Sequence, residues 1–288
     1  EVDEKIFTKE HQNTSLEIAR KSIVLLQNNQ GILPLKKLKK TRILVTGPNA
    51  NNHSILGDWT KPQPKENVIT VFEGIKSIAS KKGFQVDFHD SNSDILNITA
   101  TDISSTVEVA QDYDYVFVVV GDNSLRHLKK KKTAGENMAR ANINLAGNQL
   151  NLVKSLNKLN NELIVIYVNG KPIAEPWIAE NVNSIIEAWE PGSLGGQAVG
   201  EIVFGDVNPS GKLPLTFPRS VGQLQMIYNH KPSQYFHDYA EEKITPLYPF
   251  GHGLSYSDFN YSELDVKMSN SEKSLINVSF LLTNNSEF

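Results

Sequence analysis

The chain has 288 residues, of which 39% are hydrophobic and 21% charged, which is ordinary for a globular protein with one or two cores. A net charge of -3 gives no electrostatic reason to expect nucleic acid or an anionic membrane surface as a partner. The absence of cysteine excludes disulfides and thiolate metal sites, and no apolar run approaches the ~20 residues of a membrane-spanning helix.

Helical and strand patterns alternate along most of the chain. Thr14 followed by Glu17 fits a capping box, so we expect a helix over residues 14–28. Thr70 and Glu73 form the same pattern before a helix that ends at Gly83. Buried strands are expected at residues 42–47, 84–89, 115–120, 163–168 and 184–189, and further helices at 104–112, 148–159 and 197–204.

This alternation predicts a doubly wound, mainly parallel sheet covered by helices on both faces. Residues 208–255 contain several prolines, which favour a segment that wraps the sheet and adds an edge strand near residues 213–217. After Tyr256 the apolar residues alternate with polar ones, as in half-buried antiparallel strands.

A series of segments, taken in order, resembles the C-terminal portion of glycoside hydrolase family 3 enzymes, the β-glucosidases and their relatives. FGDVNPSGKLPLTFPRS (204–220) and PLYPFGHGLSYS (246–257) are the most specific of these segments. The others include ARKSIVLLQN (19–28), ILVTGPNA (43–50), LGDWT (56–60) and GENMARANINLAGNQ (135–149). The resemblance covers almost the whole chain.

The resemblance implies a six-stranded, mainly parallel α/β sandwich over residues 1–255 and the start of a fibronectin type III-like β-sandwich over residues 256–288. Two strands cannot bury the core of a sandwich, so we expect this second domain to be truncated. The family places a (β/α)8 barrel upstream as the partner domain, and nothing in this sequence resembles that barrel.

Retaining glycosidases use two carboxyl groups about 5 Å apart, one as nucleophile and one as general acid/base. In the family the nucleophile is an Asp of the barrel, and the acid/base is commonly a Glu on a loop of the α/β domain. Glu136 matches that acid/base in an E-x-x-x-R pattern with Arg140, before the family's L-x-G-x-Q segment at residues 145–149. Asp122 is the alternative candidate for the acid/base. At this position related sequences often have Gly-Glu, whereas this chain has Gly-Asp with a shorter side chain.

We expect Asp122 and Arg140 to line the substrate site, because the loop that carries them follows a strand predicted to be buried in a parallel sheet. Trp59 matches a position where family members place an aromatic residue beside the site mouth. Its indole face suits a pyranose ring, and a role in covering a helix end is the alternative. Lys129–Lys132 is expected to form a solvated loop that points away from Glu136.

The seven histidines show no ligand spacing, so no metal site is expected, and the resemblance implies no cofactor. The family resemblance implies that the chain is part of a retaining β-glucosidase-like enzyme, which removes a terminal β-linked glucose or a similar sugar. It also implies that this enzyme is periplasmic or secreted. Without the nucleophile domain, the isolated chain is expected to be inactive. A non-catalytic carbohydrate-binding or scaffolding module is the alternative, and a nucleotide-binding domain is disfavoured because phosphate-binding loops are missing.

Overall fold

The computed structural model describes residues 5–36, 41–229, 239–268 and 275–288. These residues fall into two compact units, Glu1–Leu254 and Ser255–Phe288, which are described separately. Within the described ranges no helix is long and apolar enough to cross a membrane. The assignment of residues 1–255 and 256–288 to two particular domain types stays a prediction.

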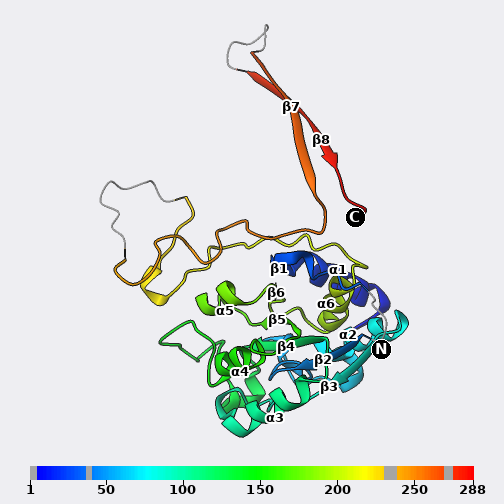
Figure 1. Ribbon diagram of the computed structural model, residues 1–288, viewed down its shortest axis with the longest axis vertical. Coiled ribbons are helices and arrows are strands. Elements are labelled where there is room, and N and C mark those ends of the chain that lie inside the picture. Colours follow the sequence, from blue (N-terminus) through cyan, green and yellow to red (C-terminus); the bar gives the residue numbers. More distant parts are fainter. Residues whose placement is uncertain (1–4, 37–40, 230–238, 269–274) are drawn as a thin grey trace. The chain divides into compact units, whose positions relative to one another are not determined.

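The first unit contains the predicted α/β sandwich, built on a six-stranded sheet with the strand order β1-β6-β5-β4-β2-β3 (Figure 1). The strands are β1 (Val24–Asn28), β2 (Arg42–Thr46), β3 (Gln85–Phe88), β4 (Tyr115–Gly121), β5 (Glu162–Val168) and β6 (Ser184–Glu187). All neighbouring pairs are parallel except β1 and β6, which are antiparallel. As the apolar runs predict, the central strands β4 and β5 are buried on both faces.

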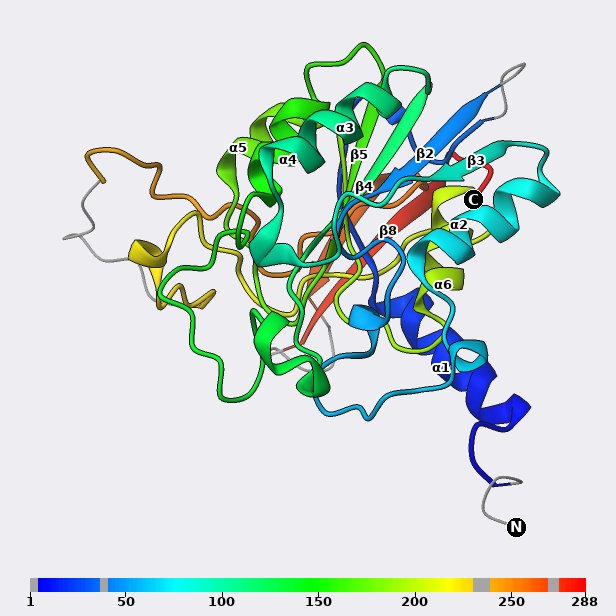
Figure 2. The ribbon, with the colours of Figure 1, turned by 90° about the horizontal axis from the view of Figure 1, so that it is seen from below.

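Helices cover both faces of this sheet. They are α1 (Lys9–Ser22), α2 (Val71–Lys81), α3 (Ala100–Ala110), α4 (Gln149–Leu156), α5 (Pro176–Asn181) and α6 (Gly195–Val203). Figure 2 shows α1, α2 and α6 on one side of the sheet and α3, α4 and α5 on the other. The absence of a side chain at Gly74 allows helices α2 and α6 to approach closely. A Cβ at this position would lie only 1.8 Å from the main-chain oxygen of Gly196.

The predicted helix over residues 14–28 is wrong at both ends. Helix α1 begins earlier, with Thr8 as its N-cap, and ends at Ser22, so Thr14 lies inside the helix and caps nothing. Residues 24–28 instead form strand β1, which pairs with β6 at the edge of the sheet. Pairing with a buried neighbouring strand outweighs the weak helical preference of this apolar stretch.

The edge strand predicted near residues 213–217 is also absent, and β1 takes that place in the sheet. Phe217 makes only an isolated bridge with Tyr248. Proline cannot donate a ladder hydrogen bond, so Pro214 and Pro218 prevent a continuous strand here. The wrapping segment nevertheless packs on the core through Leu213, Phe217 and Tyr248, all of which are buried.

The second unit consists of the antiparallel strands β7 (Phe259–Met268) and β8 (Ile276–Asn284), in agreement with the predicted strand pattern. Val266 pairs with Val278, and Met268 pairs with Ile276. These side chains are exposed rather than half-buried as predicted, because two strands alone offer no second sheet to cover them. The pairing fits the start of a β-sandwich.

Candidate active site

The candidate site lies on the loops that follow the carboxyl ends of β2, β4, β5 and β6, where ligands bind in open α/β sheets. The loop after β2 carries Asp58 and Trp59, and the long loop after β4 carries residues 122–140. Gly121 lets the β4 loop leave the sheet beside β5, because a Cβ there would lie 2.0 Å from the main-chain oxygen of Val168. Its φ of 146° also favours glycine.

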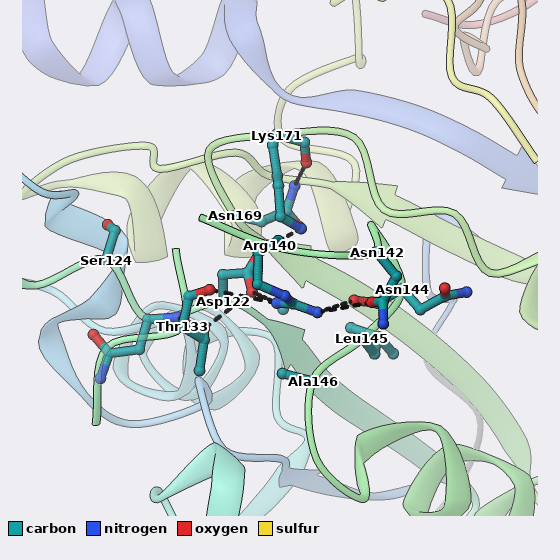
Figure 3. A network of polar contacts seen from close by, with 12 residues as sticks. Asp122, Ser124, Thr133, Arg140, Asn142, Asn144, Leu145, Ala146, Asn169 and Lys171 are labelled. Carbon is teal, nitrogen blue, oxygen red and sulfur yellow. Dashed lines mark hydrogen bonds and ion pairs between the residues drawn. The ribbon is translucent and has the colours of Figure 1, made fainter. Parts of the chain in front are cut away.

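Asp122 is the centre of a buried polar network beneath these loops, at the carboxyl-end edge of the sheet (Figure 3). Its side chain is 0% exposed, and its Oδ1 accepts hydrogen bonds of 3.0 Å from Arg140 and from the Thr133 hydroxyl. Its Oδ2 lies 2.7 Å from the Lys171 Nζ. Arg140 also donates to the main-chain oxygen of Asn144 at 2.8 Å. These contacts tie the β4 loop to the loop after β5.

Glu187, at the end of β6, is a buried carboxyl group that the sequence analysis missed. It accepts hydrogen bonds from the Trp189 N–H at 2.9 Å and from the Asn169 side chain at 3.3 Å. Burial raises its pKa to about 8, against the lowering effects of these hydrogen bonds and of Lys171. A glutamate between Ile186 and Ala188, inside the strand predicted over residues 184–189, was the available sequence signal.

Stability is expected to fall as the pH rises from about 5 to 8, because unfolding frees Glu187 to ionise at its ordinary pKa. The folded state keeps the proton until the pH passes the raised pKa. Glu187→Gln removes this penalty, so the difference in unfolding free energy between variant and parent should grow by a few kcal/mol, at roughly 1.4 kcal/mol per pH unit. Urea unfolding of both chains at four pH values checks this, and parallel pH profiles would contradict it.

Glu190 is a second partly buried carboxyl group at the same edge. It accepts a hydrogen bond from the Ser124 hydroxyl, and burial raises its pKa. The carboxylate lies close to Gly57 and Gly170, where a Cβ would be 2.7 Å and 3.1 Å from its Oε2. The glycines in the loop after β2 and in the loop after β5 therefore leave room for the carboxylate of Glu190 between these loops.

The predicted solvated lysine loop is partly wrong. Lys132 is only 8% exposed, and its Nζ donates to Asp58 at 2.9 Å and to the main-chain oxygen of Glu136 at 2.7 Å. Lys131 lies 3.5 Å from the carboxylate of Asp94. A charged run is usually solvated, but the partly buried carboxylate of Asp58, from the loop after β2, compensates the charge of Lys132. The ammonium of Lys132 reaches the main chain of Glu136 rather than its carboxylate.

Glu136 itself lies at the surface of this edge, with a side chain that is 44% exposed. Arg126 donates a hydrogen bond to its carboxylate. The guanidinium of Arg126 also lies over the indole of Trp59, 3.8 Å from the ring centre. Trp59 is still 76% exposed and presents an aromatic surface to solvent. The structure thus brings Glu136 and Trp59 together through Arg126.

Among the residues described, no three His, Asp or Glu side chains gather in a way that could hold a metal ion. The chemistry available at this edge is that of carboxyl groups, cations and an exposed indole. An exposed carboxyl group beside an aromatic surface can exchange a proton with a ligand that stacks on the ring.

Residues 23–256 match the profile of the glycosyl hydrolase family 3 C-terminal domain. The chain belongs to glycoside hydrolase family 3. It is 36% identical over 265 residues to a β-xylosidase of Formosa agariphila, a match that covers 88% of this chain and 35% of the relative. It is 33% identical over 293 residues to a periplasmic β-glucosidase of Salmonella typhimurium, covering 91% and 37% of the two chains.

Solved structures of family 3 enzymes show the same fold. A β-glucosidase from Erythrobacter marinus matches with a TM-score of 0.81 and 32% identity, over 99% of this chain and 40% of that one. A β-glucosidase from intestinal bacteria, described as involved in saponin metabolism, matches with a TM-score of 0.83 and 29% identity, over 96% and 43%. The chain therefore spans well under half the length of these family 3 relatives.

Sequence reasoning placed four residues at the site of this family 3 domain, and the structure separates them into two sets. Glu136 and Trp59 lie exposed at the edge, whereas Asp122 and Arg140 belong to the buried network beneath it. The catalytic and substrate-binding roles of all four stay predictions. Asp58 was missed although it directly precedes Trp59 in LGDWT.

Proposed function

We propose that this family 3 region supplies the general acid/base and part of the sugar pocket of a retaining β-glucosidase-like enzyme. The observation that carries the proposal is the position of Glu136, an exposed carboxyl group next to an exposed tryptophan at the carboxyl end of the sheet. Its substrate is a terminal β-linked glucose or a similar sugar. The names of the relatives, β-glucosidases and β-xylosidases, support this substrate class.

Burial favours Glu136 over Asp122 as the acid/base. A general acid must come within hydrogen-bond reach of the leaving oxygen. The side chain of Asp122 is 0% exposed and is held by Arg140 and Lys171, so it cannot meet a substrate without leaving both cations behind. The substrate-binding role predicted for Asp122 and Arg140 is therefore better described as support of the loop that carries Glu136.

Trp59 is proposed to bind the sugar through its indole face. Arg126 already lies over this ring and holds the carboxylate of Glu136. A sugar that takes the place of the guanidinium on Trp59 would also release Glu136 for proton transfer. The two residues therefore act as one unit at the mouth of the pocket.

The proposed mechanism divides the catalytic pair between two domains. Glu136 protonates the leaving oxygen and later takes a proton from water, while an Asp on an upstream (β/α)8 barrel forms the covalent glycosyl intermediate. The barrel is thus the proposed partner domain, as the family resemblance implies. A periplasmic or secreted location is proposed by analogy with the periplasmic relative.

The isolated 288-residue chain is expected to fold and to release no nitrophenol from a nitrophenyl β-glucoside above the buffer rate. Double displacement requires a second carboxyl group across the sugar ring, and none of the candidate residues takes that role. The assay compares the chain with its Glu136→Ala variant. Turnover that disappears in this variant would show that the chain carries a full catalytic pair. It would overturn the proposed division between domains.

A further inference from the structure

Asp58 and Lys132 form a closed ring of polar contacts with the main-chain N–H and C=O of Glu136. The Oδ2 of Asp58 accepts a hydrogen bond from the N–H of Glu136. The Nζ of Lys132 donates to the main-chain oxygen of Glu136 at 2.7 Å. The ring closes because Lys132 also donates to the Oδ1 of Asp58 at 2.9 Å.

The main chain bends sharply on both sides of Glu136. Gly135 has a φ of 91° and Asn137 a φ of 60°, so Glu136 stands between two residues in the left-handed region. Glycine adopts this region freely and asparagine more readily than most residues, so the two form a tight bend with Glu136 at its centre. Gly135 also lets the bend approach its support, because a Cβ there would lie 2.7 Å from Asp58 Oδ2.

The charges of the ring compensate each other. Burial would raise the pKa of Asp58, but hydrogen bonds from Lys132 and from the Glu136 N–H outweigh it and keep the pKa below its usual value. The carboxylate therefore accepts from both partners. Arg126 adds a further positive charge, because its Nε lies 3.5 Å from the Oδ1 of Asp58.

We propose that Asp58 and Lys132 are positioning residues of the reaction, which hold the acid/base Glu136 by its main chain at the edge of the pocket. The inference rests on the proposed role of Glu136. Contacts to the N–H and C=O of one residue fix its Cα and leave only its side-chain torsions free. The carboxyl group can then exchange Arg126 for a leaving oxygen without a rearrangement of the loop. Misplacement of a catalytic group by about 1 Å is enough to cost roughly 10²-fold in rate.

The first test measures amide hydrogen exchange in the 288-residue chain, and it does not depend on catalysis. Asp58→Asn and Lys132→Met each break the ring with little change in shape. Each is expected to speed exchange at residues 135–138 by about tenfold or more, while β4 and β5 stay protected. Lys131→Met is the matched control, because Lys131 is 47% exposed and pairs with Asp94 instead. Equal exchange in all variants would overturn the proposal.

The second test measures kinetics in a complete enzyme that contains this region. Both ring variants are expected to lower kcat about tenfold or more for poor leaving groups, with KM little changed and partial recovery in Lys132→Arg. In a Glu136→Gln background neither variant should lower kcat further, because the ring acts through Glu136. A full additional loss there would contradict positioning. If Glu136→Gln alone has no effect, the proposed function fails and the exchange measurement still decides the positioning claim.

Discussion

Glu136→Gln, introduced into a complete enzyme that contains this region, is expected to slow hydrolysis of glycosides with poor leaving groups by about 10²–10⁴-fold. A general acid matters most when the leaving oxygen is basic, so activated aryl glycosides should lose far less. The measurement is kcat/KM for an alkyl glucoside and for a dinitrophenyl glucoside in parent and variant. The ratio of the two losses reports the role of Glu136.

A matched control for this variant is Glu108→Gln, which removes an exposed carboxylate in the last turn of α3, outside the loops that follow the carboxyl ends of the strands. It should leave both substrates unaffected. If Glu136→Gln slows both substrates equally, or neither, Glu136 does not protonate the leaving group. Asp122 would then be the remaining candidate of the two. Sugar binding with no contribution of either carboxyl group to turnover would favour a non-catalytic carbohydrate-binding module.

Asp122→Ala is expected to produce the largest loss of stability, about 3–5 kcal/mol in the free energy of unfolding. The substitution leaves Arg140 and Lys171 close together without the carboxylate that both contact. Removal of one partner from a buried ion pair is costly because the remaining charge stays desolvated. The loop that carries Glu136 should loosen at the same time, since Arg140 would lose its inner contact.

Urea unfolding followed by tryptophan fluorescence provides the measurement. All three tryptophans, Trp59, Trp177 and Trp189, lie in the first compact unit, so the signal reports on the α/β sandwich. Glu17→Gln is the control, because Glu17 forms an exposed pair with Lys21 that contributes about 0–1 kcal/mol. A loss for Asp122→Ala no larger than the control would show that solvent readily reaches the two cations.

Local sequence patterns determined the central layers of the fold. The apolar run in residues 115–120 predicted a strand buried on both faces, and the structure confirms it as part of β4. Thr70 and Glu73 form the predicted capping box of α2. These features follow from residues near each other in the chain. The same reasoning failed at residues 24–28, because their strand pairing with β6 joins segments about 160 residues apart.

The sequence by itself determined the family, the alternating α/β architecture, and Glu136 and Trp59 as candidates at the edge of the sheet. Only the tertiary structure decided which charged groups are buried and which partners they meet. The sequence predicted a solvated run that includes Lys132. In the structure its Nζ lies 2.9 Å from Asp58, which is 74 residues earlier in the chain. The sequence also could not show that the side chain of Asp122 is fully buried between Arg140 and Lys171; its predicted role in lining the site stays a prediction. Burial and charge pairing depend on loops that the folding of the sheet brings together. The local sequence around a charged residue therefore does not predict which distant residue will pair with it.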